Sequence, residues 1–558
     1  MTMLCVPILV DSPEQGLRLA AEARDGGADL VELRLDTYYT GDDDAVQIPA
    51  IISLISQCPL PAIATCRPVL EGGHYGGPDA ARIALYQRLG SAAGPGEVPP
   101  RYIDCELATY TRSASSRQSV NLAVEHPAQA SGNSTGLILS THNFQTRPPD
   151  LIRQIEAMLK EPATRVVKVA YFARSIRDNI ELLDLAAELR REHGKASIML
   201  GMGPFGLMSR VLAPKFGALL TFAALRRDEQ TAPGQPILRE LTEDYRFSAI
   251  SESTKVYGIV GWPVEHALSP MVHNAGFEAV SHDGVYLPMP IAGGEVGSYE
   301  SFKGTLLDFI EHASLDFAGC SVTIPHKENL VALAREMTEA GDTRWHLDRL
   351  SQACNAANTL TVRRDARGAA VRLDVTNTDG PGFISALIPA VGEVAGRDVV
   401  ILGAGGTARA IAAALLLEGA RVWIINRTPA RADELAASLD AALGGGRPIA
   451  RTDVSALARL APAAVVNCTS LGMRGGPGPD RCPLDEQVLA RLPSTCVIAD
   501  CVYRPVQTPL LRAAMAVGLP TLDGVGMFVE QAALQFAQWT GTPAPRRLFE
   551  RTVREIAG

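Results

Sequence analysis

The segment VVILGAGGTARAIAAALLL, residues 399–417, contains a short apolar strand, a glycine-rich turn and an apolar helix in immediate succession. Small residues in such a turn let the backbone and the N-terminus of the following helix approach a pyrophosphate closely. A glycine motif alone is a weak signal, but its position between a strand and a helix predicts a dinucleotide-binding βαβ unit. The predicted cofactor-binding residues of the turn are Gly403, Ala404, Gly405, Gly406, Thr407 and Ala408.

The next predicted strand, 421–425, is followed by Asn426, Arg427 and Thr428 instead of an acidic residue. An acid at this position usually binds the ribose 2′-hydroxyl of NAD, whereas an arginine and hydroxyls suit a 2′-phosphate. The sequence therefore favours NADP(H), with Arg431 as a further contact. The alternative for Arg427 is an ordinary solvated surface residue. Towards the N-terminus, the same βαβ pattern extends back to about residue 255.

The first half of the chain has a different rhythm. Segments with helical spacing, such as 14–25 and 176–193, separate most of its short, β-branched apolar runs. These runs occupy 4–10, 30–36, 61–67, 101–107, 136–144, 165–172, 196–203 and 219–225. Eight strand signals alternating with helices predict a closed (β/α)8 barrel. Turn signals within 226–254 indicate an active-site loop followed by a linker.

Composition and charge restrict what this 558-residue chain can do. Hydrophobic residues make up 47% and charged residues 20%, which suits packed domains and not extended disorder. The formal net charge of −9 argues against a nucleic-acid-binding surface over the whole chain. The apolar run 410–417, the longest that we find beside a charged flank, is far shorter than a membrane span.

The ten cysteines are scattered and form no CxxC pair. They fit reduced thiols in a cytosol better than a disulfide framework or a zinc site. The N-terminus carries no secretion signal, so we expect a cytoplasmic protein. From the cysteine pattern we expect no metal cofactor. The oligomeric state stays open.

Ionisable residues end most of the predicted barrel strands, where barrel enzymes carry their chemistry. These ends carry Glu32, Arg34, Arg67, Asp104, Glu106 and His142. Lys168 lies inside the apolar run VVKVA, in a chain with seven lysines. An amine must be neutral to attack a carbonyl, and burial near arginines favours that form, so Lys168 is a candidate Schiff-base lysine. A structural ion pair with a barrel carboxylate is the alternative.

His142 ends the neighbouring predicted strand within the sequence STHNF, 140–144. A lone histidine is more often structural, but beside an imine lysine it is the natural proton shuttle. Glu71, which follows the Arg67-Pro68 pair by a few residues, would orient the imidazole.

Six motifs of the first half, taken in order, resemble type I 3-dehydroquinate dehydratases. They are ELRLD at 32–36, TCRP at 65–68 with EGG at 71–73, STHNF at 140–144, Lys168, MG at 202–203 with SR at 209–210, and APGQ at 232–235. The resemblance implies that Lys168 forms an imine with the C3 ketone of 3-dehydroquinate. His142, positioned by Glu71, would then remove the C2 proton and later protonate the departing hydroxyl.

The same resemblance implies a substrate pocket. Arg210 would hold the substrate carboxylate through two parallel hydrogen bonds. The family's loop usually begins with serine, and Thr231 keeps that hydroxyl here. The residues that would contact the ring hydroxyls or shape the pocket are Glu32, Arg34, Arg67 and Gln235.

Motifs of the second half, over about 255–545, resemble shikimate dehydrogenases. Lys327 ends SVTIPHK at 321–327, and Asp379 lies in NTDG at 377–380. Further matches are LSP at 268–270, NT at 358–359, NCTSLGM at 467–473, YRP at 503–505 and the spaced Gly524, Met527 and Gln531. The whole chain thus resembles a fused dehydroquinate dehydratase and shikimate dehydrogenase, which would place it in aromatic amino acid biosynthesis.

This second resemblance implies reduction of the C3 ketone of 3-dehydroshikimate to shikimate with NADPH. Lys327 would give a proton to the developing alkoxide, and Asp379 would hold Lys327 in place. Ser269 would hold the carboxylate. The remaining implied substrate contacts are Thr323, Asn358, Tyr503 and Gln531, and the implied further cofactor contacts are Gly524 and Met527.

The resemblances imply an α/β chain of three parts. A (β/α)8 TIM barrel occupies 1–248. A substrate-binding domain occupies 255–382 and is completed by about 525–558, and a Rossmann NADP domain occupies 383–524.

One position departs from the shikimate dehydrogenase pattern. The family usually has two hydroxyls in His-Ser-x-Ser-Pro, but this chain reads HALSP at 266–270. Ala267 removes one donor to the substrate carboxylate, an interaction worth about 1.5–3 kcal/mol. A preference for quinate is therefore an alternative.

Two competing hypotheses are less consistent with the sequence. A catalytically inactive metabolite sensor would not need Lys168, His142, Lys327 and Asp379 together. For the first half alone, a class I aldolase would also use a barrel lysine, but it would not need the pair of His142 and Glu71.

Overall fold

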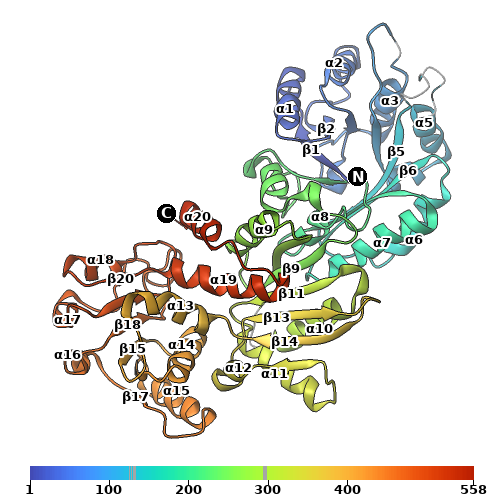
Figure 1. Ribbon diagram of the computed structural model, residues 1–558. Helices are drawn as coiled ribbons and strands as arrows, with labels where there is room; N and C mark the ends of the chain where they lie inside the picture. Colours follow the sequence, from blue (N-terminus) through green and yellow to red (C-terminus); the bar gives the residue numbers. More distant parts are fainter. Residues whose placement is uncertain (93, 125, 127–128, 130–133, 293–297, 558) are drawn as a thin grey trace. The chain divides into compact units, whose positions relative to one another are not determined.

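The computed structural model describes residues 1–92, 94–124, 126, 129, 134–292 and 298–557 (Figure 1). The chain divides into two compact units, Met1–Thr254 and Lys255–Gly558. Each unit is described by itself below.

The first unit is built on one parallel sheet of eight strands, in the order β7-β6-β5-β4-β3-β2-β1-β8. A backbone hydrogen bond of 2.8 Å from the Leu219 N–H to the Ser197 carbonyl links β7 to the residue before β8, so the ring is nearly closed. The predicted barrel is thus confirmed, with a weaker seam at this point. The strands are β1 Met3–Leu9, β2 Leu30–Arg34, β3 Ala62–Thr65, β4 Tyr102–Glu106, β5 Gly136–Asn143, β6 Thr164–Phe172, β7 Ala196–Met202 and β8 Leu220–Phe222.

Helices surround this barrel (Figure 1). They are α1 Pro13–Asp25, α2 Asp44–Gln57, α3 Asp79–Gly90, α4 Leu107–Thr111, α5 Ala114–Val124, α6 Leu151–Lys160, α7 Asp178–His193 and α8 Leu207–Val211. Alternation along β7 places Ile198, Leu200 and Met202 in one buried cluster with Phe222. This apolar filling leaves the polar strand ends to form the mouth of the barrel.

The segment after β8 is packed onto the first unit. Its side chains Leu238, Leu241, Tyr245 and Phe247 are buried, and 240–244 form a helical turn. The prediction of a linker is therefore wrong for this part, because these apolar side chains cover the barrel instead of leaving the chain free.

The second unit contains two six-stranded sheets. The first has the order β10-β9-β11-β13-β14-β12, and its β13 runs antiparallel to both β11 and β14. This antiparallel pairing breaks the βαβ pattern. Its strands are β9 Lys255–Gly261, β10 Gly284–Pro290, β11 Phe317–Val322, β12 Trp345–Leu347, β13 Thr359–Arg364 and β14 Ala370–Thr376.

The second sheet is parallel, in the order β17-β16-β15-β18-β19-β20, as a Rossmann-like domain requires. Its strands are β15 Asp398–Leu402, β16 Arg421–Ile425, β17 Ile449–Arg451, β18 Ala464–Asn467, β19 Val497–Asp500 and β20 Thr521–Leu522. The helices of the unit are α9 Ser269–Ala279, α10 Ser298–Glu311, α11 Lys327–Glu339, α12 Arg349–Cys354, α13 Asp379–Val391, α14 Gly406–Leu417, α15 Pro429–Ala442, α16 Leu457–Leu460, α17 Glu486–Leu489, α18 Pro509–Ala516, α19 Gly524–Thr540 and α20 Arg546–Ala557.

Candidate active sites

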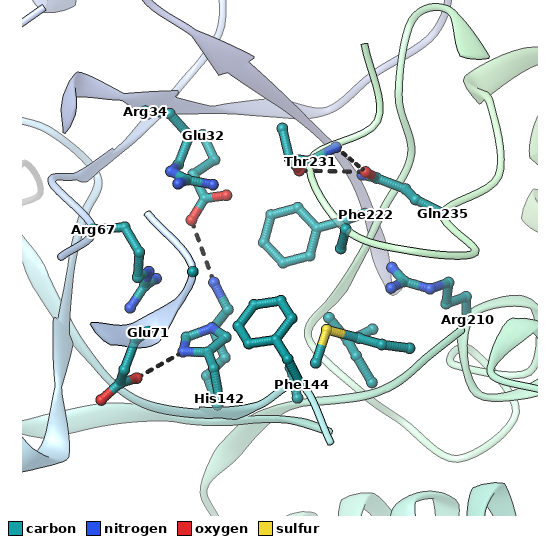
Figure 2. A pocket seen from close by; sticks show the side chains of 16 residues that line it. Glu32, Arg34, Arg67, Glu71, His142, Phe144, Arg210, Phe222, Thr231 and Gln235 are labelled. Atoms are coloured by element: carbon teal, nitrogen blue, oxygen red, sulfur yellow. Dashed lines mark hydrogen bonds and ion pairs between the residues drawn. The ribbon is translucent and has the colours of Figure 1, made fainter. Parts of the chain in front are cut away.

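One pocket at the barrel mouth is lined by every site residue that the sequence assigned to the first unit (Figure 2). These residues come from different strand ends and loops, so the barrel fold brings them together. They are Glu32, Arg34, Arg67, Glu71, His142, Lys168, Arg210, Thr231 and Gln235.

Lys168 lies in the middle of β6 and is 4% exposed. Its Nζ is 2.7 Å from Asp104 Oδ2 and 3.3 Å from Glu32 Oε1. The ring of Phe222 lies 4.7 Å from the same nitrogen. Lys168 is therefore ion-paired with barrel carboxylates, and its nitrogen also faces the pocket.

Asp104 and Glu106 were placed at a strand end from the sequence without a role, and the structure shows what Asp104 contacts. Its Oδ2 accepts from Arg67 Nη2 at 2.8 Å, and its Oδ1 accepts from Ser140 Oγ at 2.6 Å. Burial alone would raise the pKa of Asp104, but the charges of Arg67 and Lys168 outweigh it and hold that pKa well below its usual range. The available signal was its place on the strand next to the one that ends in His142.

The arginines Arg34 and Arg67 are held by carboxylates of the protein itself. Arg34 forms a two-bond pair with Asp36, at 2.8 and 2.9 Å. Arg67 donates to Glu106 Oε1 at 2.7 Å in addition to Asp104. These contacts fix both guanidinium groups as rigid walls of the pocket.

His142 and Glu71 form the predicted pair, with 3.0 Å between Nδ1 and Oε2 (Figure 2). Burial, together with the charges of Arg67 and Lys168, holds the pKa of His142 well below its ordinary value. Burial also raises the pKa of Glu71 to about 8. The imidazole is therefore neutral and able to accept a proton at neutral pH.

Arg210 and Gln235 keep free donors in the pocket. Arg210 is 1% exposed, and among the described residues nothing accepts from its Nε; burial lowers its pKa to about 10. The Gln235 Nε2 also has no partner within the described chain, while its Oε1 accepts from the Thr231 N–H at 3.0 Å. Figure 2 places Arg210 across the pocket from Arg67 and Glu71. An unpaired buried guanidinium is costly, so this one is set up for an anionic ligand.

The second unit joins Lys327 and Asp379. Lys327 is the first residue of α11, Asp379 is the first residue of α13, and Nζ lies 2.5 Å from Oδ2. Asn358 Nδ2 donates to Asp379 Oδ1 at 2.8 Å, and Asn358 Oδ1 accepts from the Thr378 N–H at the same distance. Asn358 directly precedes the antiparallel strand β13 and so lies beside this pair.

Four other predicted substrate contacts lie at the ends or on the faces of elements of this unit. Ser269 begins α9 and Thr323 directly follows β11. Tyr503 follows β19, with its ring 4.9 Å from that of Phe528. Gln531 lies on α19 so close to α13 that a Cβ on Gly382 would be 2.7 Å from its backbone nitrogen. Within the described chain, no hydrogen bond ties these four side chains to Lys327 or Asp379.

The glycine-rich turn after β15 fits the diphosphate of a dinucleotide. Gly403 has φ +113°, and a Cβ on Gly405 would meet no protein atom within 4 Å. Gly405 caps α14 without a side-chain hydrogen bond, so the first N–H groups of the helix stay available for an anion. The turn comprises Gly403, Ala404, Gly405, Gly406, Thr407 and Ala408.

Most of the residues that follow β16 lie at the surface. Arg427, Thr428 and Arg431 are all exposed, and Asn426 Nδ2 donates to the Thr428 carbonyl at 2.9 Å. Exposed cations beyond the second strand suit a ribose 2′-phosphate. Gly524 and Met527, at the start of α19, are buried.

Neither a metal site nor a membrane-spanning helix is found among the described residues. They contain no group of three or more His, Cys, Asp or Glu side chains arranged to hold a metal ion. In the same part of the chain, no helix is both long and apolar enough to cross a membrane.

Family models match both units. The model of type I 3-dehydroquinase matches 4–252. The model of the shikimate dehydrogenase substrate binding domain matches 259–360, that of shikimate/quinate 5-dehydrogenase matches 388–461, and that of the shikimate 5′-dehydrogenase C-terminal domain matches 524–554.

Relatives cover the chain in the same way. The bifunctional 3-dehydroquinate dehydratase/shikimate dehydrogenase, chloroplastic, of Arabidopsis thaliana is 33% identical over 98% of this chain and 83% of its own length. The NADP(+) shikimate dehydrogenase of Methanocella arvoryzae is 37% identical over 54% of this chain and 98% of its own. The solved shikimate 5-dehydrogenase of Thermus thermophilus, in complex with NADP(H) and shikimate, is 29% identical, covers 54% of this chain and 99% of its own, and has a TM-score of 0.44.

The barrel with its buried lysine and the two-sheet unit with its Rossmann-like domain define a lyase joined to an oxidoreductase. The chain belongs to the family of bifunctional 3-dehydroquinate dehydratase/shikimate dehydrogenases of the shikimate pathway. The predicted family and both enzyme classes are confirmed.

Proposed function

We propose that the barrel dehydrates 3-dehydroquinate through an imine on Lys168 and that the second unit reduces 3-dehydroshikimate to shikimate with NADPH. The observation that carries this proposal is the barrel pocket itself. It combines a buried lysine, a neutral histidine and an unpaired arginine, which are the nucleophile, the proton shuttle and the anion anchor that the reaction needs.

In the proposed dehydration, Arg210 binds the substrate carboxylate and Gln235 donates its free Nε2 hydrogen bond to the ring. The neutral Nζ of Lys168 attacks the C3 carbonyl, and one water leaves as the imine forms. The imine withdraws electrons and acidifies the C2 proton, which the neutral imidazole of His142 accepts. The C1 hydroxyl leaves with a proton from His142. Water then hydrolyses the imine, so the net change is the loss of one water.

Glu71 positions the imidazole for these two proton transfers. Its carboxyl contacts Nδ1, so Nε2 is left to face the substrate. Glu32, Arg34, Arg67 and Thr231 complete the pocket wall, and we propose that they select the ring by the positions of its hydroxyls.

In the proposed reduction, NADPH supplies the hydride. The turn at 403–408 holds its diphosphate, and Arg427, Thr428 and Arg431 favour its 2′-phosphate over the bare hydroxyl of NADH. We also propose that Asn426, Gly524 and Met527 line the cofactor site. Lys327 gives a proton to the oxygen that forms from the C3 carbonyl.

Asp379 and Asn358 position the Lys327 side chain relative to the substrate. Asp379 accepts from both Lys327 and Asn358, so the three side chains form one hydrogen-bonded group. Ser269, Thr323, Tyr503 and Gln531 are proposed to bind the carboxylate and the ring hydroxyls.

The proposed domain limits are 1–248 for the barrel, 255–382 with 525–558 for the substrate-binding domain, and 383–524 for the cofactor-binding domain. The proposed location of the protein is the cytoplasm.

Borohydride trapping tests the imine. The protein is mixed with 3-dehydroquinate and sodium borohydride, digested, and mapped by mass spectrometry. We expect a secondary amine on Lys168 that carries the substrate or its dehydrated product. In either case the carbonyl oxygen is lost as water and borohydride adds two hydrogens, and the dehydrated adduct lacks one further water. An inactivated protein without an adduct on Lys168 would rule out the covalent mechanism.

The cofactor is tested by comparing NADPH with NADH in shikimate dehydrogenation. Arg427→Ala should raise the KM for NADP by about tenfold or more, because an exposed charge-assisted phosphate contact is lost, and should leave the KM for NAD unchanged. Arg451→Ala, at an exposed arginine of the same domain that pairs with Asp433, serves as the control. An equal change for both cofactors would contradict the assignment of Arg427.

A further inference from the structure

We propose that Asp104 is the counter-ion of the Lys168 nitrogen throughout the dehydratase reaction, and that Arg82 on α3 is a positioning residue that holds Asp104 through Glu106 and Arg67. The proposal rests on the imine mechanism above. It adds two residues that are not part of the pocket lining, of which Asp104 contacts the reacting nitrogen.

A chain of alternating charges leads from the reacting nitrogen out to α3. Lys168 Nζ is 2.7 Å from Asp104 Oδ2, which is 2.8 Å from Arg67 Nη2. Arg67 Nη1 is 2.7 Å from Glu106 Oε1, and Glu106 Oε2 is 2.6 Å from Arg82 Nη1. Each charge is thus compensated by its neighbours.

The outer end of this chain is anchored at three points. Arg82 Nη2 donates to Asp79 Oδ1 and to Thr109 Oγ1, both at 2.8 Å, and Nη1 also donates to the Cys66 carbonyl at 2.8 Å. Arg82 therefore ties α3 to β4 and to the residue after β3. Because it does not line the pocket, its burial serves the network and not the substrate.

Burial makes the network strongly coupled. Arg82, Asp104 and Glu106 are fully buried, and Arg67 is nearly so. A buried charge that loses its partner must find another or change its protonation state. Removal of Arg82 would therefore be felt at Lys168, because Glu106 is fully buried and Arg67 nearly so, and solvent can compensate little of the change.

The chemistry needs a counter-ion of this kind. The protonated imine carries a positive charge on nitrogen, and a fixed carboxylate at hydrogen-bond distance stabilises it. Arg67 and Ser140 share the same carboxylate, at 2.8 and 2.6 Å. Asp104 therefore divides its negative charge among Arg67, Ser140 and Lys168.

Other charged and titratable groups also face Lys168, from most strands of the barrel. They are Cys5 on β1, Glu32 and Arg34 on β2, and His142 on β5, with Arg67 following β3. The sides of β7 and β8 that line the pocket contribute Leu200, Met202 and Phe222. Of the carboxylates, Asp104 makes the shorter contact with Nζ and Glu32 the longer one.

The test is the pH dependence of imine formation in a Glu71→Gln background, where the raised pKa of Glu71 no longer contributes. The borohydride-trapped adduct on Lys168 is measured against pH at short times. The acid limb is the part of this curve, on the low-pH side, in which the amount of adduct rises with pH. Arg82→Gln adds one net negative charge to the network, so the acid limb should move to higher pH by about one unit. Asp104→Asn removes one negative charge, so the limb should move to lower pH, and dehydratase turnover should fall at least about tenfold.

Two further variants separate positioning from packing. Arg82→Lys keeps the charge and should restore the limb of the background protein. Arg190→Gln removes an exposed ion pair with Glu252 and should leave the profile unchanged. The proposal would be overturned if Arg82→Gln and Asp104→Asn shifted the acid limb in the same direction. It would also be overturned if Arg82→Lys gave the same profile as Arg82→Gln.

If Arg82→Gln does not fold, Ser140→Ala takes its place. This change removes a donor to Asp104 Oδ1, so more negative charge faces Lys168 and the limb should move to higher pH, opposite to Asp104→Asn. An unchanged limb would overturn the proposal. Failure of the imine mechanism is a different result, because the background protein itself would then give no adduct on Lys168.

Discussion

Lys168 and Lys327 are two of the seven lysines in the chain, and the two units hold them differently. Lys168 lies inside a strand, is almost fully buried and contacts two carboxylates. Lys327 is the first residue of a helix, and its side chain is 16% exposed and contacts one carboxylate. The difference suits their proposed tasks, since a nucleophile needs a dry, charge-balanced network and a proton donor needs access to the forming alkoxide.

Exchanging the lysines for alanine tests this comparison most severely. Lys168→Ala should lower dehydratase activity by about 10³-fold or more and leave shikimate oxidation with NADP intact, because the nucleophile is lost from one unit alone. Lys327→Ala should do the reverse. Both activities are measured on the same purified chain. Loss of both activities in either folded variant would show that the two sites are not independent.

Arg210 sharpens the comparison on the side of the barrel. Arg210→Ala removes the unpaired guanidinium and should lower dehydratase kcat/KM by about 10- to 100-fold, mainly through KM. Arg210→Lys should recover only part of this loss, because a lysine cannot bind a carboxylate in the two-bond geometry. Steady-state kinetics with 3-dehydroquinate measure kcat and KM of each variant. An unchanged KM in Arg210→Ala would show that Arg210 does not bind the substrate.

Glu71 gives the barrel a pH dependence of stability. Burial raises its pKa from 4.5 to about 8 in the folded chain, so the folded state keeps a proton that the unfolded chain has lost. This contribution is complete below pH 4.5 and is lost as pH rises through 8. Between pH 5 and 9 the wild-type barrel should therefore lose about 4 kcal/mol more unfolding free energy than Glu71→Gln. Urea unfolding of each protein, followed by far-UV circular dichroism, measures the difference; parallel pH curves would contradict the raised pKa.

Ala267 gives the smallest expected effect, on the side of the second unit. Ala267→Ser restores a hydroxyl beside Ser269 and should lower the KM for shikimate by about three- to tenfold. Oxidation of shikimate and of quinate is measured in parallel. A KM for shikimate that stays the same or rises would show that the missing hydroxyl is not a substrate contact.

Motifs with fixed spacing predicted most of the fold and the pocket. The alternation of strands and helices identified the barrel because each strand end contributes to one mouth, so Lys168, His142 and Arg210 had to lie close together. The turn at 403–408 identified the Rossmann-like sheet for a similar reason, since such a turn between a strand and a helix is typical of that topology.

Long-range pairing was less accessible to sequence reasoning. The antiparallel placement of β13 depends on a partner about 40 residues away, and alternation of residues alone does not specify it. Asp104 escaped assignment because its meaning depends on Arg67 and Lys168, which come from other strands. Arg82 gave no signal at all, because a helical arginine is ordinarily solvated and its burial depends on packing against β4.

The most direct test of the account is a one-pot assay with the purified chain, 3-dehydroquinate and NADPH, with the product identified by mass. The account predicts shikimate, formed by dehydration in the barrel and reduction in the second unit. Quinate as the product would contradict it, because the second unit would then reduce the first substrate directly. Absence of NADPH consumption, together with tight substrate binding, would contradict it in favour of a metabolite sensor.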